Sequence, residues 1–407
     1  MSSLELQQIA LDDALPFARS VSRNFYEDES DEELDHWVRL IQEPELDFRG
    51  WVVRDGEQLV ANYGIYSMDV STPGGGRMPM AGVTAVGVAQ THRRRGLLNR
   101  MMVAGLDDAA ERGEPVAMLY ASESIIYGRY GFGVVAPTVG YHIDRSVTFR
   151  DPVDTSIVVP AAPEQALAEW PSILESVRDR RPGCATRSPE WWRRTLVKDP
   201  ESWRDGASAR RLVHVPGRGY ASFRVKDGAW KDNLPDGTVR LGELVAADAE
   251  AEAALWQFVC DIDLTSAVAA SLRPPDCPLP ELVTDRLRLR TKAWYPLYAR
   301  LLDVQKAFEG RTYAATAAIV LDVGDPTRDQ SGTWLLDASP DGVSMTRTDR
   351  DADLSLPIDA LASVWLGGVR AVQLAGARRL VERRAGAAAE LDRLVATDLA
   401  PWNPFEF

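Results

Sequence analysis

The sequence of 407 residues is poor in cysteine, histidine and lysine. Its three cysteines, Cys184, Cys260 and Cys277, are too few for a disulfide framework and too scattered for a metal cluster. The four histidines show no i, i+4 pairing. These residue types and spacings predict a protein that holds no metal.

The chain also lacks the segments that carry proteins into or across membranes. Its longest apolar runs fall far short of the about 20 residues that span a bilayer. Residues 1–8 (MSSLELQQ) have neither the basic region nor the apolar core of a secretory signal. Together with the low cysteine content, these features predict a cytoplasmic protein.

Positive charge is in deficit, with 46 Lys and Arg against 60 Asp and Glu and a net charge of −14. Nucleic-acid binding needs a basic footprint, and anionic membrane surfaces attract basic segments. We therefore expect neither nucleic acid nor membrane as a partner, whereas a cationic partner suits this charge. The excess of acidic over basic residues is denser in residues 1–150, which contain 22 acidic residues, 14 arginines and no lysine.

Chain length and the positions of prolines predict three domains. At about 150 residues per domain, 407 residues make two or three. A proline-rich stretch at residues 158–163 (VVPAAP) and a second proline after Leu279 mark the boundaries. We therefore expect domains at residues 1–155, 156–284 and 285–407.

The first part reads as an α/β unit. A hairpin is predicted at 51–66 around Asp55-Gly56, a strand at 82–89, a helix from 97 to about 112 and a strand at 116–121. Residues 156–284 repeat this order of elements and predict a degenerate copy that packs rather than catalyses. The third part is predicted to be α+β, and its expected strands and helices lie at 287–291, 316–323, 333–336, 357–366 and 387–397.

A basic loop, residues 93–96 (RRRG), lies between the predicted strand and helix. A helix N-terminus presents unpaired N–H groups and partial positive charge, which favour phosphate. Gly96 lets the backbone approach an anion closely, and the arginines add charge-assisted hydrogen bonds. The loop therefore predicts a pyrophosphate site, and the alternative interpretation is a solvated basic turn.

The strand, Arg93-x-x-Gly96 and the following helix resemble the acetyl-CoA motif of GNAT-type N-acetyltransferases. The general pattern, Gln/Arg-x-x-Gly-x-Gly/Ala, is not met at Leu98, where a small residue is usual. Residues 88–98 (VAQTHRRRGLL) and 121–133 (ASESIIYGRYGFG) resemble a narrower family, the actinobacterial enhanced intracellular survival (Eis) acetyltransferases, in which that leucine is normal. The ending, residues 405–407 (FEF), is similar to the end of that family's chains.

This resemblance implies an α/β (α+β) fold with two GNAT-like mixed-sheet domains in tandem, followed by a sterol-carrier-protein-like α+β domain. It implies acetyl-CoA as co-substrate, no metal, and a homohexamer built as a dimer of trimers. Tyr127 would be the general acid for the CoA thiolate, and the C-terminal carboxylate of Phe407 would be the general base. The cofactor-binding residues that it implies are Val86, Gly87, Val88, Arg93, Arg94, Arg95, Gly96, Leu97, Leu98, Asn99, Ser122 and Glu123.

Elementary chemistry is consistent with these roles. An alkyl ammonium, with a pKa of about 10.4, must lose a proton before its nitrogen attacks a thioester. A phenol near pKa ~10 stays protonated at neutral pH and can donate to the leaving sulfur. A terminal carboxylate near pKa ~3.5 is a weak base, so it more plausibly holds the ammonium and relays its proton. For Tyr127 the alternative interpretation is a structural tyrosine in a glycine-rich turn.

Seven carboxylates crowd into residues 27–35. Most are interpreted as a solvated helix start, where the dipole favours acids. Glu27, with Trp37 and Glu406, is predicted to line an acidic pocket for an amine, and His92 is expected to pack the phosphate loop. The predicted function is transfer of acetyl to an amino group of an aminoglycoside-like, polyamine-like or lysine-type acceptor. The alternatives are a sterol-carrier-like protein for a hydrophobic ligand and a catalytically silent acyl-CoA-binding regulator.

Overall fold

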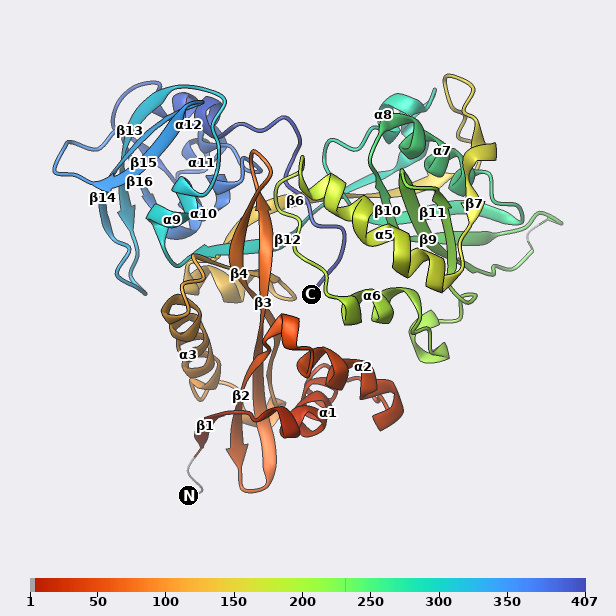
Figure 1. The fold of residues 1–407 in the computed structure, drawn as a ribbon, viewed down its shortest axis with the longest axis horizontal. Helices are drawn as coiled ribbons and strands as arrows, with labels where there is room; N and C mark the ends of the chain where they lie inside the picture. The colour runs from red at the N-terminus through yellow and green to blue at the C-terminus, as the bar shows by residue number, and fades with distance from the viewer. Residues whose placement is uncertain (1–3, 231) are drawn as a thin grey trace.

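The computed structural model of the chain describes residues 4–230 and 232–407, arranged in three lobes (Figure 1). The N-terminal lobe carries α1 to α3, the middle lobe carries α5 to α8, and the C-terminal lobe carries α9 to α12. The chain ends at the centre of the molecule, close to the place where the lobes meet (Figure 1).

Within the described residues, twelve strands form one mixed sheet that runs through the first two lobes, in the order β1-β2-β3-β4-β5-β12-β6-β11-β10-β9-β8-β7. The two halves join where β6 pairs antiparallel with β11. The strands are β1 (Glu5–Gln8), β2 (Arg49–Asp55), β3 (Gln58–Thr72), β4 (Gly76–Val88), β5 (Val116–Tyr120), β6 (Gly133–Asp144), β7 (Val159–Pro160), β8 (Arg211–Val215), β9 (Gly219–Lys226), β10 (Gly237–Ala246), β11 (Thr265–Arg273) and β12 (Thr291–Leu301).

The first lobe follows the predicted order of elements. The hairpin of β2 and β3 turns at Gly56, and β4 connects through α3 (Leu97–Glu111) to its parallel neighbour β5. The apolar stripe of α3 is buried as its 3.6-residue spacing predicted, from Leu97 to Ala109. Two further helices, α1 (Ala14–Asn24) and α2 (Asp31–Ile41), pack together beside β3. The predicted hairpin, strand, helix and strand are therefore confirmed.

The strand predicted at 287–291 is wrong. Residues Arg286–Leu289 form a 3₁₀ turn, and the strand β12 begins at Thr291 and lies between β5 and β6, antiparallel to both. The alternation of Leu and Arg suggested a half-buried strand, but Leu287 is 88% exposed in the turn. A segment placed in the third domain by its sequence position thus completes the sheet of the first lobe.

The middle lobe contains α5 (Pro163–Arg178), α6 (Pro189–Leu196), α7 (Ala249–Cys260) and α8 (Leu279–Leu282) around β7 to β11. The predicted repeat of the first part's order is confirmed, because the hairpin of β8 and β9 is followed by β10, α7 and the parallel strand β11. The C-terminal lobe has a separate sheet in the order β15-β14-β13-β16-β17. Its elements are α9 (Val304–Glu309), β13 (Ala317–Gly324), β14 (Gly332–Ser339), β15 (Gly342–Arg347), β16 (Leu354–Pro357), α10 (Ile358–Trp365), α11 (Ala371–Gly376), β17 (Val381–Glu382) and α12 (Ala387–Val395).

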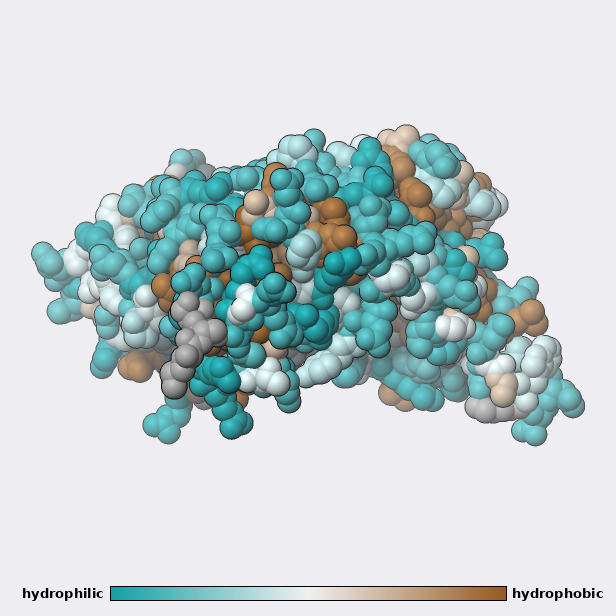
Figure 2. Space-filling model, turned by 90° about the horizontal axis from the view of Figure 1, so that it is seen from below, coloured by the Kyte–Doolittle hydropathy of each residue, from teal (hydrophilic) through white to brown (hydrophobic). Residues whose placement is uncertain are grey.

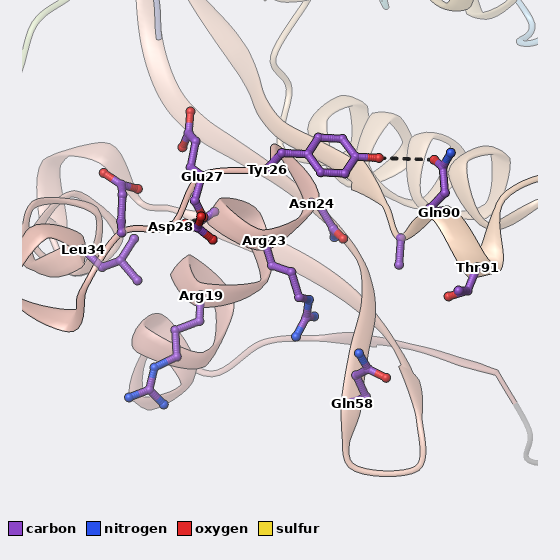
Figure 3. Close-up of a pocket in the computed structure, with 13 residues that line it drawn as sticks. Arg19, Arg23, Asn24, Tyr26, Glu27, Asp28, Leu34, Gln58, Gln90 and Thr91 are labelled. Atoms are coloured by element: carbon purple, nitrogen blue, oxygen red, sulfur yellow. Dashed lines mark hydrogen bonds between the residues drawn. The ribbon is translucent and has the colours of Figure 1, made fainter. Parts of the chain in front are cut away.

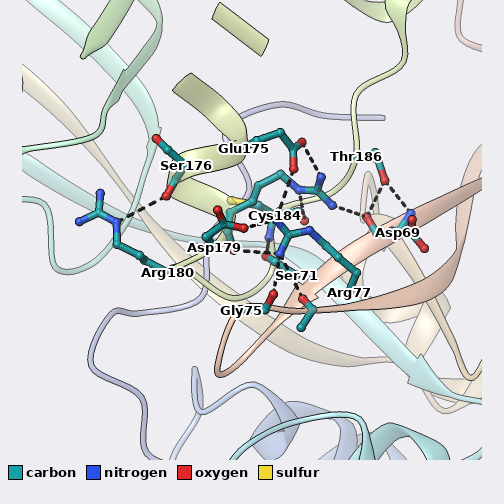
Figure 4. A network of polar contacts seen from close by, with 12 residues as sticks. Asp69, Ser71, Gly75, Arg77, Glu175, Ser176, Asp179, Arg180, Cys184 and Thr186 are labelled. Atoms are coloured by element: carbon teal, nitrogen blue, oxygen red, sulfur yellow. Dashed lines mark hydrogen bonds and ion pairs between the residues drawn. The ribbon is translucent and has the colours of Figure 1, made fainter. Parts of the chain in front are cut away.

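The long hairpin of β3 and β4 connects all three lobes. Near its tip, Ser71 donates to the carbonyl of Arg181 at 2.7 Å. Arg77, also near the tip, pairs with Asp179 at 2.6 Å (Figure 4). On the other side, the Thr72 hydroxyl donates to the carbonyl of Gly310 at 2.8 Å. The hairpin therefore contacts both the middle and C-terminal lobes and limits how the lobes can move relative to one another.

The face of the molecule that points downward in Figure 1 is mostly hydrophilic, and its apolar side chains form separate patches (Figure 2). Within residues 4–230 and 232–407, none of the helices has both the length and the apolar character to cross a bilayer.

Candidate active site

The splay between β4 and β5 creates the site. The parallel pairing of these strands ends at Val83 and Leu119, whereas β4 remains paired with β3 as far as Val88. A bulge interrupts the β3 pairing at Ala85, whose φ is +52° and whose carbonyl accepts from the Asn62 amide at 2.5 Å. The edge of β4 beyond Val83 therefore leaves the ladder with β5 and faces open space.

The loop after β4 ends at Gly96, the N-cap of α3, with a φ of +76°. A Cβ at this position would meet no atom within 4 Å, so the left-handed conformation rather than crowding favours glycine here. Because the Gly96 cap carries no side chain, the first-turn N–H groups of α3 remain available to an anion. His92 packs the loop as predicted, because it is buried and its Nε2 lies 3.0 Å from the carboxylate of Asp55.

A cavity of about 540 Å³ lies along this edge and loop. Of the predicted cofactor residues, only Arg95 is not among the cavity's lining residues, and its guanidinium donates to the carbonyl of Thr91 at 3.2 Å. The lining also includes three aromatic residues and one arginine that the sequence did not single out for the cofactor, namely Phe25, Tyr26, Tyr130 and Arg129. The predicted residues that line it are Val86, Gly87, Val88, Arg93, Arg94, Gly96, Leu97, Leu98, Asn99, Ser122, Glu123 and Tyr127.

Tyr127 lies at the end of the cavity on the short helix α4 (Ser124–Tyr127) and is 4% exposed. Burial raises the pKa of its phenol above the ordinary value of 10, and a polar contact with Ser122 opposes part of this shift. The phenol therefore stays protonated throughout the neutral range and can donate a proton.

A second cavity, of about 420 Å³, meets the first at Tyr127. Both cavities are lined by Phe25, Val86, Ser122 and Tyr127. The second cavity is also lined by all the residues predicted for the acceptor side, namely Glu27, Trp37, Glu406 and Phe407.

The end of the chain forms one wall of this second cavity. The ring of Phe407 packs edge-on against Tyr120 at 5.4 Å between centroids. Gly82 makes room for it, since a Cβ there would lie 3.3 Å from the ring. Glu406 also lines this cavity, and desolvation by the surrounding protein raises the pKa of its carboxyl above the ordinary value.

Most carboxylates of residues 27–35 have structural partners, as interpreted from the sequence. Asp31 pairs with Arg19, and Asp35 pairs with Arg39. Glu33 forms a capping box with Ser30, and Glu29 accepts from the indole of Trp203 at 3.4 Å. These residues stabilise the start of α2.

Glu27 differs from those carboxylates because it lines the second cavity and its side chain extends away from Arg23 (Figure 3). Desolvation, followed by repulsion from Glu29, raises the pKa of its carboxyl. Glu27 also lines an adjacent cavity of about 630 Å³ that contains Arg19, Arg23 and Asp28 (Figure 3). Of the acidic run, Glu27 is therefore the residue to which the interpretation as part of an acidic pocket applies, because it reaches the second cavity.

Sequence reasoning missed two aromatic walls of the second cavity. Tyr120, the last residue of β5, and Trp294, in the exposed half of β12, both line it. Tyr120 follows a continuous apolar strand and could have been identified as a strand-end residue. Trp294 had no such signal, because its place depends on the non-local insertion of β12.

Comparisons with known proteins agree with this architecture. Residues 5–135 and 183–301 match two families of acetyltransferase (GNAT) domains, and residues 304–404 match a sterol carrier protein domain. The chain is 42% identical to an N-acetyltransferase of Streptomyces coelicolor, over 87% of this chain and 88% of the relative. It is 32% identical to the N-acetyltransferase Eis of Mycobacterium tuberculosis, over 88% and 89%.

Among solved structures, Eis1 from Mycobacterium abscessus superposes with a TM-score of 0.84 at 29% identity, with 100% of both chains covered. The predicted fold class is thereby confirmed, with two tandem GNAT domains followed by a sterol-carrier-like domain. The chain belongs to the Eis family of GNAT N-acetyltransferases.

Proposed function

We propose that this acetyltransferase transfers the acetyl group of acetyl-CoA directly to an amino group of a small cationic amine. The observation that carries the proposal is the meeting of two cavities at Tyr127, one beside the phosphate-type loop and one lined by Glu27 and Glu406. Direct transfer needs only that both reactants are held in line, so no nucleophilic side chain is required.

The residues of the first cavity suit acetyl-CoA. The N-terminus of α3, with Arg93 and Arg94 beside it, offers N–H groups and positive charge to the pyrophosphate. The edge of β4 at Val86 to Val88 offers backbone groups to the amides of the pantetheine arm, in the manner of an added strand. Ser122 and Glu123 line the same groove near Tyr127.

The second cavity suits an ammonium group. Glu27 and Glu406 supply negative charge, and Trp37 and Phe25 supply aromatic faces. We propose an aminoglycoside-like, polyamine-like or lysine-type acceptor on this basis.

In the proposed step, the α-carboxylate of Phe407 takes one proton from the acceptor ammonium and passes it to solvent. The neutral nitrogen then attacks the thioester carbonyl carbon, a C–N bond forms and the C–S bond breaks. Tyr127 donates its proton to the departing sulfur and recovers one from the new amide nitrogen. The products are the N-acetylated amine and CoA, and one proton is released overall.

A panel of amines tests this function. Purified protein is incubated with acetyl-CoA and each amine, and the release of free CoA is followed with a thiol reagent. Turnover with a cationic amine is the expected result. Binding of acetyl-CoA without turnover for any amine would favour the silent acyl-CoA binder, and lipid that co-purifies with the C-terminal lobe in an inactive protein would favour the carrier.

Extension of the chain beyond Phe407 tests the base. A few added residues convert the α-carboxylate of Phe407 into an amide and move the terminal carboxylate away from the cavity, so kcat should fall by about 10²-fold or more. The control carries the same residues added before Met1. If the extended protein turns over at the rate of the control, Phe407 is not the base.

The proposal includes a homohexamer, built as a dimer of trimers, in the cytoplasm. Exposed apolar side chains around the start of β12, among them Leu287 and Tyr295, support burial against other copies. The free thiols of Cys184, Cys260 and Cys277 suit a reducing compartment. Sedimentation velocity tests the assembly, since the chain mass of 44.9 kDa separates a hexamer from smaller species.

A further inference from the structure

The middle lobe repeats the strand splay that forms the cofactor site of the first lobe. In the first lobe the parallel pairing ends at Val83 and Leu119, and in the middle lobe the pairing of β10 with β11 ends at Leu241 and Ala270. A bulge follows in both: Gly242 and its successor on β10 face a single residue of β9. The middle lobe therefore has the backbone geometry of a GNAT cofactor cleft.

A buried arginine occupies this second cleft. Arg273 is 1% exposed, and its guanidinium donates to the carbonyls of Leu244 at 2.9 Å and Gly242 at 3.2 Å. These carbonyls lie on the stretch of β10 that corresponds to the cofactor-facing edge of β4. A positive φ of +52° at Leu272 accompanies the register shift that precedes Arg273 in β11.

The start of the following helix is also unsuited to phosphate. In the first lobe the N-cap of α3 is Gly96, which has no side chain. In the middle lobe the N-cap of α7 is Asp248, whose carboxylate accepts from the N–H of Ala251 at 3.0 Å and pairs with Arg218. A carboxylate at the helix start repels the anion that an acyl-CoA would bring there.

The C-terminal tail packs into this closed cleft. The Trp402 indole donates to the carbonyl of Leu272 at 2.6 Å, and its ring lies 5.5 Å from the Arg273 guanidinium. Trp402 is 4% exposed and belongs to the apolar core of the middle lobe, with Trp170 and Tyr220. The Arg273 charge is thus compensated by backbone carbonyls and by the face of a tail residue.

The next tail residue connects the middle lobe to the active site. The Asn403 side chain accepts from the N–H of Ala185 at 3.0 Å and donates to the Tyr120 hydroxyl at 3.3 Å and to the carbonyl of Phe405 at 2.6 Å. Ala185 is itself bridged to β3 at Val70. Asn403, 1% exposed, therefore has its side chain fixed from both domains, four residues before the end of the chain.

We propose that the middle domain is a positioning device for catalysis, in which a GNAT cofactor cleft has become the socket for the tail. Arg273 closes the cleft to acyl-CoA and supports Trp402, and Trp402 with Asn403 fixes where Phe407 enters the acceptor cavity. Trp402 and Asn403 are positioning residues, and this inference rests on the proposed role of the Phe407 carboxylate.

Two variants and a matched control test the socket. Trp402→Phe keeps a ring but removes the donor to Leu272, and Asn403→Ala removes the contacts to Ala185 and Tyr120. Both should lower kcat by about tenfold or more while KM for acetyl-CoA stays within about twofold, because misplacement of a catalytic group acts on the chemical step. The control is Trp170→Phe, a buried tryptophan of the same core that does not hydrogen-bond the tail.

The outcomes separate this inference from the proposed function. If the Trp402 and Asn403 variants keep the parental kcat while extension beyond Phe407 abolishes it, the socket is wrong and the base assignment stands. If extension has no effect, the role of Phe407 fails and the inference fails with it. If kcat fell as much in Trp170→Phe as in Trp402→Phe, general destabilisation would explain the loss of activity, and the inference would be overturned.

A second readout does not depend on Phe407. Calorimetric titration of the full chain with CoA should give one binding site per chain. Two sites per chain would show that the cleft of the middle domain is open and would overturn the proposal.

Discussion

At the scale of the residue, Tyr127 lines both of the cavities to which we assign cofactor and acceptor. Tyr127→Phe removes the hydroxyl and keeps the ring, so kcat should fall by about 10²-fold, the usual contribution of a general acid. The dissociation constant for acetyl-CoA, measured by calorimetry, should stay within about twofold because the ring is retained. If the variant instead lost acetyl-CoA binding, Tyr127 would have a structural role in its glycine-rich turn.

We expect Glu27 and Glu406 to make acceptor binding depend on pH. The pKa of both carboxyls is raised above 4.5, chiefly by desolvation. Below its pKa each group is neutral and no longer attracts an ammonium, so KM for a cationic acceptor should rise as the pH falls into the acidic range, and the rise should begin at a higher pH than an ordinary carboxyl would give. Steady-state kinetics across this range measure the effect.

Glu27→Gln is the matched variant for this pH dependence, because it keeps the shape of the side chain and removes its titration. Its KM for the acceptor at neutral pH should be raised about three- to tenfold, equivalent to roughly 1 kcal/mol of lost attraction. The rise of KM at low pH should be shallower than in the parent. An unchanged pH profile would exclude Glu27 as a titrating contact of the acceptor.

The structure brings predicted site residues together where their sequence signal was local. The Arg93 to Asn99 loop combines a strand, a glycine and a helix start within a few residues, and the structure brings all of them except Arg95 to one cavity. Trp294 and Trp402 carried no comparable signal. Their places depend on contacts with segments more than a hundred residues away, which hydrophobic periodicity does not encode.

At the scale of the element, the helix α3 and its entry loop form the part of the site most completely specified by sequence. Gly96 has a φ of +76°, and an L-residue in this region costs about 1–2 kcal/mol. Gly96→Ala should therefore either strain the loop or shift the N–H groups at the start of α3. We expect KM for acetyl-CoA to rise about fivefold or more, as lost hydrogen bonds to the pyrophosphate would give.

Gly113→Ala is the control for this substitution. Gly113 lies just past the other end of α3 with a φ of +81°, and a Cβ there also meets no atom within 4 Å. Its alanine variant should lose similar stability in thermal unfolding and keep the parental KM for acetyl-CoA. Equal rises of KM in the two variants would assign the effect to α3 as a whole rather than to the anion site.

The position of the strand β12 in the large sheet could not be predicted from the sequence. Its apolar half, from Leu297 to Leu301, reads as a strand, but nothing local indicates that it pairs between β5 and β6. The same strand places Trp294 at the acceptor cavity. A boundary drawn from prolines and composition cannot detect a strand that returns to an earlier domain.

At the scale of the whole molecule, buried contacts join the C-terminal lobe to the large sheet. The C-terminal lobe joins the large sheet through an ion pair between Arg300 on β12 and Asp325, and both side chains are 0% exposed. Asp325 also accepts from Thr327 at 2.9 Å, and Arg300 lies against Gly131 in the turn after Tyr127, where a Cβ would be 2.3 Å from the guanidinium. This pair therefore lies between the C-terminal lobe and the turn that follows Tyr127.

Removal of one partner of this pair should be costly. Arg300→Met leaves the Asp325 carboxylate buried and uncompensated, which should destabilise the fold by about 3–5 kcal/mol. The control Arg286→Met breaks an exposed pair with Glu281, whose side chains are 56% and 70% exposed, and should cost under about 1 kcal/mol. The double change Arg300→Met with Asp325→Leu should recover much of the loss, because an apolar pair needs no charge compensation. Urea unfolding followed by tryptophan fluorescence measures all three, and an Arg300→Met variant no less stable than Arg286→Met would mean that the buried pair does not hold the C-terminal lobe to the sheet.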